Sequence, residues 1–271
     1  MELVEVSRGF SPIVLGLPHA GTWLPPRIAA RLNRTGRALA DTDWHVDRLY
    51  DGLLEDVTIV RATFHRYVID ANRDPSGASL YPGQNTTGLV PLTDFDGRDI
   101  WSDPPDEKEI EARRQEYHAP YHAALLAELV RLRAAQGVAL LYDCHSIRSR
   151  IPFLFEGTLP DFNIGTNDGT SCAPEIEAAV TGICTGAEGY SSVLNGRFRG
   201  GWSTRHYGRP QAGIHAIQME LAQSTYLAAE APPWDYDPDR AARVRLYLKN
   251  VLQSIVGVLE SMKRTGHDEG H

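Results

Sequence analysis

Two histidines stand where the sequence changes abruptly from apolar to polar residues. His19 follows the apolar stretch 11–17 in "SPIVLGLPHAG", and His145 follows 137–143 in "GVALLYDCHS". One histidine after a strand is usually a hydrogen-bonded loop residue. Two of them beside a carboxylate are typical of a zinc hydrolase, which takes three His, Asp or Glu ligands and keeps one position open for water. We therefore expect His19 and His145 to share a metal site.

The third ligand of such a site should be acidic, and the segment "DTDWHVDRLYD" at 41–51 offers several candidates. They are Asp41, Asp43 and Asp47, together with a further histidine, His45. Some of these residues also fit the acidic N-terminus of a helix, where a cap and a negative charge near the helix dipole stabilise the first turn. Residue types alone leave the choice of ligand open.

Glu220 is unusual because it lies within an apolar stretch, "IHAIQMELA". An ionised carboxylate in a buried strand is costly unless it is paired, lies near a metal, or transfers protons. A structural salt bridge is one interpretation. We prefer a general base, which would take a proton from water and pass it to a leaving nitrogen.

Arginines recur near these strand ends. Arg73 follows Asn72, Arg148 lies three residues after His145, and the glycine-containing stretch 195–210 holds further arginines, namely Arg197, Arg199, Arg205 and Arg209. Guanidinium groups bind carboxylates through two parallel hydrogen bonds, so a cluster of them favours a small substrate with one or more carboxylates.

Short apolar runs alternate with helical patterns along the chain. The candidate strands are 11–17, 57–63, 67–71, 137–143, 151–157 and 214–221, and the candidate helices are 106–135 and 240–263. This alternation predicts an α/β layered fold with a mostly parallel central sheet. Ligands of such sheets bind beyond the carboxyl ends of the strands, where His19, Asn72 and His145 are expected to meet.

Cys144 lies next to His145 and so resembles a cysteine–histidine pair for nucleophilic catalysis. Adjacent strand residues point to opposite faces of a sheet, however. We interpret Cys144 as a small buried residue that fills space in the core.

Composition limits the class of protein. The chain has 271 residues, 42% of them hydrophobic, and no linker-like segment, which predicts one domain over residues 1–264 and a frayed tail at 265–271. A net charge of −8 argues against nucleic acid as a partner. Three cysteines without a disulfide pattern, and no apolar run of membrane or signal length, predict a cytoplasmic protein that does not bind membranes.

Longer motifs in the same order resemble the N-formylglutamate amidohydrolase family. They span about residues 11–226 and read "LPHAGT", "DTDWHVDRLYD", "YVIDANRDPSGASLYPGQNTTGLVPLTDFDG", "DCHSIRS", "LPDFNIGT", "NGRFRGGW" with "TRHYG", and "IHAIQMELAQSTY". The resemblance implies a phosphorylase/hydrolase-like α/β fold related to zinc carboxypeptidases. It also implies hydrolysis of N-formyl-L-glutamate to formate and L-glutamate, a step of histidine degradation.

The resemblance assigns roles to individual residues. It implies that His19, Asp43 and His145 bind Zn²⁺ or another divalent metal, with Asp47 as a lower-ranked competitor for Asp43. Glu220 resembles the general base of the wider superfamily. Asn72 and Arg73 resemble its pair for a substrate carboxylate, and we add Arg148, Arg199 and Arg205 as further substrate-binding candidates.

Two other functions fit the same residues. One is a deacylase or carboxypeptidase-like hydrolase acting on another N-acyl acidic amino acid. The other is a non-catalytic protein that binds acidic amino acids through its arginines, although two histidines, an acidic candidate and Glu220 together argue for catalysis. The sequence does not predict the oligomeric state.

Overall fold

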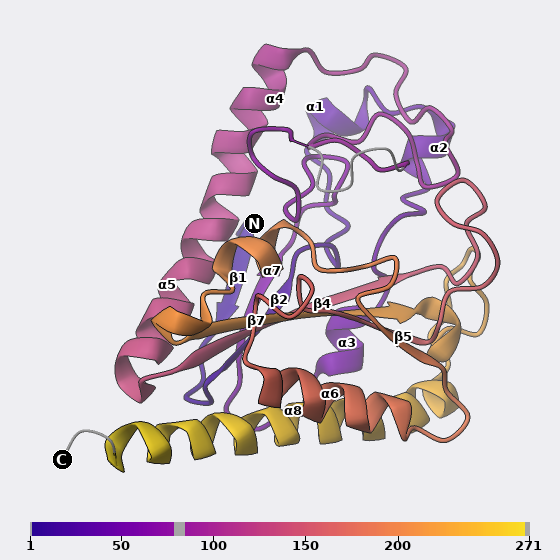
Figure 1. Cartoon of the computed structure of the whole chain (residues 1–271). Helices are drawn as coiled ribbons and strands as arrows, with labels where there is room; N and C mark the ends of the chain where they lie inside the picture. The colour runs from indigo at the N-terminus through magenta and orange to yellow at the C-terminus, as the bar shows by residue number, and fades with distance from the viewer. Residues whose placement is uncertain (1, 79–84, 269–271) are drawn as a thin grey trace.

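The computed structural model describes residues 2–78 and 85–268 of the chain. Its strands are β1 (Val4–Ser7), β2 (Ile13–Leu17), β3 (Thr58–Ala62), β4 (Ala139–Ile147), β5 (Phe162–Gly165), β6 (Ser192–Leu194) and β7 (Ile214–Ala222). They form one sheet in the order β1-β3-β2-β4-β7-β5-β6 (Figure 1). β1 runs antiparallel to β3 and β5 antiparallel to β7, whereas the other neighbouring pairs are parallel. The expected α/β fold with a mostly parallel sheet is thus confirmed.

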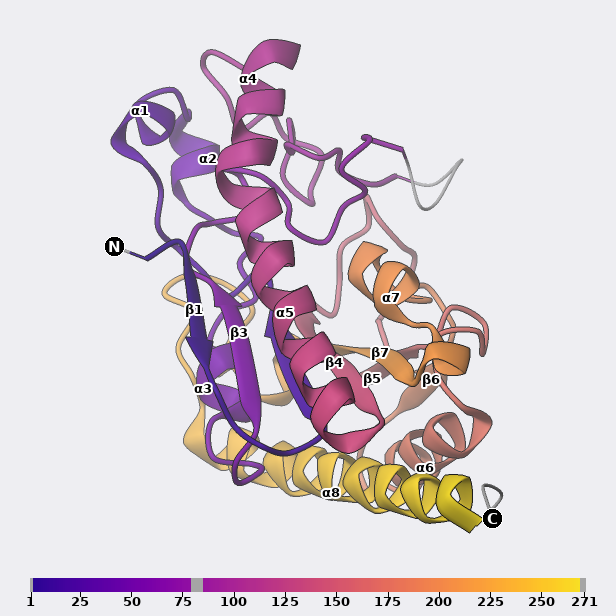
Figure 2. The same ribbon diagram turned by 90° about the vertical axis from the view of Figure 1, so that its left-hand side faces the viewer.

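Helices cover both faces of this sheet. They are α1 (Pro26–Ala29), α2 (Arg34–Arg37), α3 (Val46–Tyr50), α4 (Glu107–Arg113), α5 (Ala119–Gln136), α6 (Pro174–Thr185), α7 (Trp202–Tyr207) and α8 (Pro238–Asp268). In Figures 1 and 2, α6 and α8 lie along one side of the sheet and α5 and α7 along the other. All residues of β2 and β4 are therefore buried, which explains their nearly continuous apolar sequence.

Each face of the sheet packs into its own apolar cluster. On the α8 side, Tyr142 and Cys144 of β4 pack with residues such as Leu248 and Leu252. On the α5 side, Leu141 belongs to a second cluster with Leu125 and other α5 residues. This alternation confirms that Cys144 and its two neighbours in the strand point to opposite faces.

The two long predicted helices are both present. Asp106 caps α4 by accepting a hydrogen bond from the Glu109 backbone, and a π-helical turn, Arg114–His118, joins α4 to α5. Gly137, in the left-handed region with φ of 78°, ends α5. α8 begins at Pro238, after the cap Asp237, and continues to Asp268. The tail expected from residue 265 therefore starts within this helix, and its last residues, 269–271, lie outside the described part of the chain.

Two predicted strands are absent from the described sheet. Residues 67–71 are buried but irregular, and Leu89, His65 and Arg113 satisfy their backbone groups instead of a neighbouring strand. Residues 151–157 form a turn in which Leu154 and Phe155 both donate to the Ile151 carbonyl. Both predictions were wrong because apolar runs record burial and do not identify the partner of the backbone. The sequence also did not reveal the short strands β1, β5 and β6.

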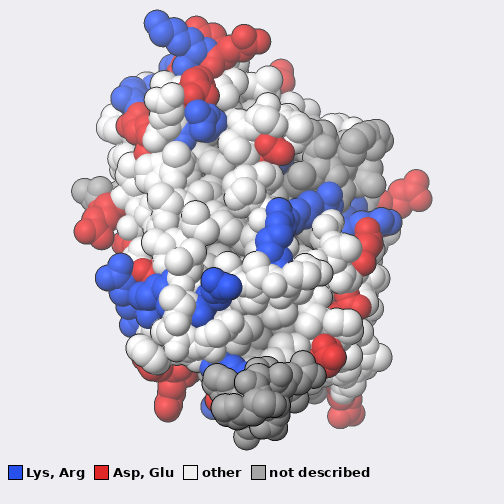
Figure 3. Space-filling model, turned by 60° about the vertical axis from the view of Figure 1, so that its left-hand side comes forward, with Lys and Arg blue, Asp and Glu red and all other residues white. Residues whose placement is uncertain are grey.

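The face of the molecule in Figure 3 carries small separate groups of Lys and Arg and of Asp and Glu within a broad uncharged area. Among the described residues, none of the helices combines the length and apolarity that crossing a bilayer requires. The single-domain organisation remains a prediction.

Arg113 anchors the irregular segment to the helix. Its side chain is 2% exposed, pairs with Glu109 at 2.5 Å and donates to the carbonyls of Tyr67 and Val68 at 3.4 and 3.1 Å. Arg113→Leu removes these donors, so we expect the free energy of unfolding to fall by about 2–4 kcal/mol in a urea titration. Arg114→Leu is the matched control, because Arg114 pairs only with the exposed Glu111 among the described residues and its loss should change stability little. Equal losses in the two variants would contradict this role of Arg113.

Candidate active site and metal centre

The register of β4 and β7 gathers polar side chains on one face of the sheet. His145 lies opposite Glu220, and Asp143 lies opposite Gln218. Because side chains two residues apart on a strand share a face, all four point toward the α5 and α7 side. The sequence had predicted that His145 follows the end of the strand. Instead, His145 lies inside the buried strand β4.

His19, Asp43 and His145 converge within this buried region. His19 follows β2, which is the parallel neighbour of β4, and Asp43 lies in the turn before α3. The two Nδ1 atoms of the histidines are 3.2 Å apart, and Asp43 Oδ2 lies 3.2 Å from Nδ1 of His145 and 3.8 Å from Nδ1 of His19. Each residue is at most 3% exposed. The structure thus brings together all three residues that the resemblance implied as metal ligands.

A carboxylate stands behind each imidazole. Asp70 Oδ1 lies 2.7 Å from Nε2 of His19, and Asp143 Oδ2 lies 3.1 Å from Nε2 of His145. An ionised carboxylate only accepts hydrogen bonds, so each Nε2 carries the proton and each neutral ring presents the Nδ1 lone pair. Metal-binding histidines are held in this way in many proteins.

This arrangement fits a cation. Three acceptors, the two Nδ1 lone pairs and Asp43 Oδ2, face one another, and Ser146 donates its backbone N–H to the same oxygen at 3.1 Å. Burial and the nearby Arg66 lower the pKa of His19. Burial also disfavours charge on His145, but Asp143 and Asp43 outweigh it and raise the pKa of His145 well above its usual value. The cluster therefore holds a proton readily, and nitrogen and carboxylate donors of this kind suit Zn²⁺ or another divalent metal.

Glu220 is 6% exposed and lines a pocket beside this cluster. Burial raises its pKa to about 8. Gln218 Nε2 donates to Glu220 Oε2 at 3.0 Å, so the hydrogen-bond partner that the described residues give this carboxylate is an amide and not an arginine or lysine. This favours proton transfer over a structural salt bridge.

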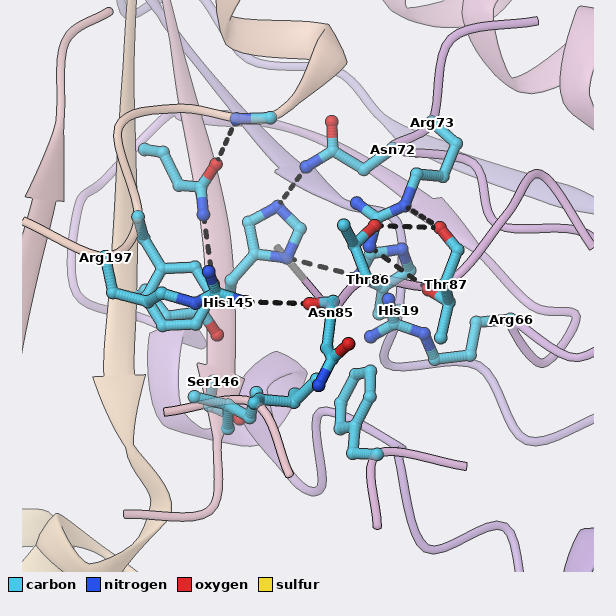
Figure 4. A pocket seen from close by; sticks show the side chains of 17 residues that line it. His19, Arg66, Asn72, Arg73, Asn85, Thr86, Thr87, His145, Ser146 and Arg197 are labelled. Atoms are coloured by element: carbon cyan, nitrogen blue, oxygen red, sulfur yellow. Dashed lines mark hydrogen bonds between the residues drawn. The ribbon is translucent and has the colours of Figure 1, made fainter. Parts of the chain in front are cut away.

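Three arginines line the same pocket: Arg66, Arg73 and Arg197 (Figure 4). Arg66 pairs with Asp70 at 2.5 Å, lies 3.7 Å from Asp43, and has an Nε without an acceptor among the described residues. Arg73 donates to the Thr87 carbonyl and hydroxyl, and Arg197 donates to the Asn85 carbonyl at 2.9 Å. These contacts tie the segment 85–87 to the rim of the pocket.

The other predicted substrate-binding residues lie differently. Arg148 pairs with Asp96 at 3.0 Å, Arg199 pairs with the exposed Asp168 at 3.3 Å, and Arg205 donates to the Gly200 carbonyl. None of these three lines the pocket among the described residues, so the structure does not bring them to the site.

Asn72 does line the pocket. Its Oδ1 accepts from the Ser203 backbone at 2.8 Å, so its Nδ2 faces Asp143 and donates to Oδ2 of that residue at 3.1 Å. Asn72 thereby helps to hold the carboxylate that orients the His145 ring. The substrate contact of Asn72 remains a prediction.

The competing candidates lie outside this cluster. Asp47 is 38% exposed and pairs with Arg61, which supports the choice of Asp43 over Asp47. His45 contacts the Trp234 carbonyl instead. Cys144 is buried in the opposite apolar cluster, and burial raises the pKa of its thiol, so it lacks the thiolate character of a nucleophile.

Sequence reasoning missed several residues of the site. Arg66 and Asp70 were hidden in "RYVIDA", where the argument used for Glu220, a charged residue in an apolar stretch, would have exposed them. Asp143 and Gln218 each precede an assigned residue by two positions, which is the spacing of a shared strand face. Asn85 to Thr87 lie in an uncharged polar stretch of the sequence, which gave no comparable signal.

The first test of the centre is its metal content. Asp43→Ala removes one of the three converging acceptors and should lose bound zinc, as should His19→Ala and His145→Ala, when purified protein is dialysed and measured by atomic emission. Asp47→Ala is the matched control and should keep wild-type content. Retention of metal by Asp43→Ala together with loss by Asp47→Ala would show that the other carboxylate is the ligand.

Comparisons with known proteins agree with this geometry. The chain is 46% identical to N-formylglutamate deformylase from Pseudomonas aeruginosa and 44% identical to that from Pseudomonas putida, in both cases over 258 residues, 94% of this chain and 96% of the relative.

The crystal structure of N-formylglutamate amidohydrolase from Ralstonia eutropha JMP134 has the same fold, with a TM-score of 0.78 and 24% identity over 98% of this chain and 100% of that one. A gene product from Agrobacterium tumefaciens aligns with a TM-score of 0.72 and 20% identity over 96% and 97% of the two chains. The sequence profile of N-formylglutamate amidohydrolase matches residues 11–227. The chain therefore belongs to the N-formylglutamate amidohydrolase family.

Proposed function

We propose that this chain hydrolyses N-formyl-L-glutamate to formate and L-glutamate, using a divalent metal, Zn²⁺ or another, held by His19, Asp43 and His145. The observation that carries the proposal is the convergence of these three acceptors beside Glu220 in a pocket lined by arginines. Family membership and the names of the two Pseudomonas relatives support the choice of substrate.

The site divides the reaction among its residues. A metal ion bound there supplies Lewis-acid activation of water and of the formyl carbonyl. Glu220 takes the proton of the attacking water and returns it to the glutamate nitrogen as the C–N bond breaks. A carboxylate whose pKa is raised to about 8 by burial is well suited to both transfers near neutral pH.

Arg66 is the residue that we assign to the developing negative charge. Attack on the formyl carbon places that charge on the former carbonyl oxygen, and Arg66 lies beside the metal-binding residues with an Nε that has no acceptor among the described residues. A preorganised cationic donor in a buried site stabilises such an oxyanion more than water does.

Recognition depends on the glutamate part of the substrate. A formyl group offers only a hydrogen atom beyond its carbonyl, so affinity must come chiefly from two carboxylates. Arg73 and Arg197 lie on opposite sides of His145 in Figure 4 and both line the pocket, which supports their binding these groups. The small dicarboxylate substrate, the cytoplasmic location, the place in histidine degradation and the relation to zinc carboxypeptidases remain predictions.

The decisive experiment measures formate release from N-formyl-L-glutamate by the purified protein. We expect turnover that a chelator abolishes and that added zinc or another divalent metal restores. N-formylaspartate and N-acetylglutamate serve as matched substrates and should react more slowly. Faster turnover of N-acetylglutamate would identify a deacylase of wider specificity, and binding of glutamate without turnover of any substrate would identify a binding protein.

Glu220→Gln tests the proton transfer separately from binding. The amide keeps the shape of the side chain but cannot accept the proton, so kcat should fall by roughly 10²–10⁴-fold while metal content and KM change little. Steady-state kinetics with metal analysis measure all three quantities. A near wild-type kcat would return Glu220 to a structural role.

A further inference from the structure

The side chain of Gln218 lies beside Glu220 on the same face of β7, two residues earlier in the strand. It is 4% exposed. A glutamine amide offers one acceptor and one donor end, and a buried amide is restrained when both ends are used. Both ends of Gln218 are used here.

The orientation of this amide follows from one contact. The backbone N–H of Gly201 donates to Gln218 Oε1 at 2.6 Å. A backbone N–H can only donate, so the atom facing Gly201 must be the oxygen and the opposite NH₂ must face Glu220. Nε2 then donates to Glu220 Oε2 at 3.0 Å, which leaves Oε1 of Glu220 for proton transfer.

Glycines allow the Gly201 backbone to come this close. Gly165 of β5 pairs with Gln218, and a Cβ at Gly165 would lie 2.5 Å from the backbone nitrogen of Gly200. A Cβ at Gly201 would lie 2.4 Å from Asn72 Nδ2. The chain at 200–201 therefore rests directly on the sheet and against the site. Residues 197–201, which we call the strap, begin with Arg197 at the pocket rim and end at the start of α7.

We propose that Gln218, oriented by the Gly201 backbone, is a positioning residue that fixes the rotamer and the proton-accepting oxygen of Glu220. The inference rests on the proposed role of Glu220 as general base. It also links substrate recognition to chemistry, because the strap that presents Arg197 to the pocket also sets the amide that holds the base.

A double-mutant cycle tests the proposal. Gln218→Met keeps the length of the side chain but removes both hydrogen bonds, and it should lower kcat by roughly 10- to 100-fold, with KM and metal content little changed. In the Glu220→Gln background the same substitution should have almost no further effect, because the proton transfer that Gln218 supports is already lost. Gln218→Asn, which keeps an amide but withdraws it by one methylene, provides the same comparison should the methionine variant fold poorly.

The matched control is Gln223→Met. Gln223 is also a buried glutamine that follows β7, but its amide donates to the Thr42 carbonyl and the Ser146 hydroxyl. Its effect on kcat should be equal in the two backgrounds. Three results for Gln218→Met would overturn the positioning role: the same fold-decrease in kcat in the wild-type and Glu220→Gln backgrounds, an unchanged kcat, or a rise in KM alone. Near wild-type turnover by Glu220→Gln alone would instead overturn the proposed role of Glu220 as general base, and absence of formate release by the unsubstituted protein would overturn the proposed function, so these failures are distinguishable.

Discussion

Three hydrogen-bond acceptors face one another at the buried end of a pocket, and the rest of the site is arranged around that constraint. The Nδ1 atoms of His19 and His145 and the Oδ2 atom of Asp43 repel one another unless a cation lies among them. Leaving such groups buried without a partner costs several kcal/mol. The neighbouring parallel strands β2 and β4 supply the two histidines, and Asp70 and Asp143 keep each ring turned toward the shared space.

Charge balance explains why so many carboxylates can be buried together. In the proposed function, the negative charges of Asp43, Asp70 and Asp143 would be offset by Arg66 and a divalent ion, which would leave the ionisation of Glu220 as the charge that changes during the reaction. Burial alone would raise the pKa of Asp70, but Arg66 and His19 hold it well below its usual value. Arg66 is therefore both a counter-ion to these aspartates and a neighbour of the reacting group. A lysine would not match its forked contacts equally well.

The sequence allowed prediction of those parts of the protein where local pattern and tertiary structure agree. Strand β7 and the two long helices follow from burial and periodicity, as does β4 up to residue 143, and the family motifs pointed to His19, Asp43 and His145, which the structure brings together. The segment carrying Arg66 and Asp70 was misread because its burial resembles that of a strand, while its backbone groups bond to His65, to Leu89 and to side chains of α4 and α5 instead of a neighbouring strand. The sequence suggested three further substrate-binding residues by residue type alone, namely Arg148, Arg199 and Arg205. Residue type does not show where a long flexible side chain ends.

The π-helical turn Arg114–His118 joins two parts of a helix that both contact the irregular segment from Tyr67 to Arg73. Before it, Arg113 donates to the carbonyls of Tyr67 and Val68, and within or after it, His118 and His122 contact the carbonyls of Arg73 and Ala71 at 3.0 and 2.7 Å. α4 and α5 thus hold the same irregular segment at two places. The π-helical turn sets the rotation of the α4 contacts relative to the α5 contacts, since deleting one residue would turn α4 by about 100° relative to α5. Substitutions should therefore accumulate in this turn during evolution more readily than insertions or deletions, because only a change of length alters the phase.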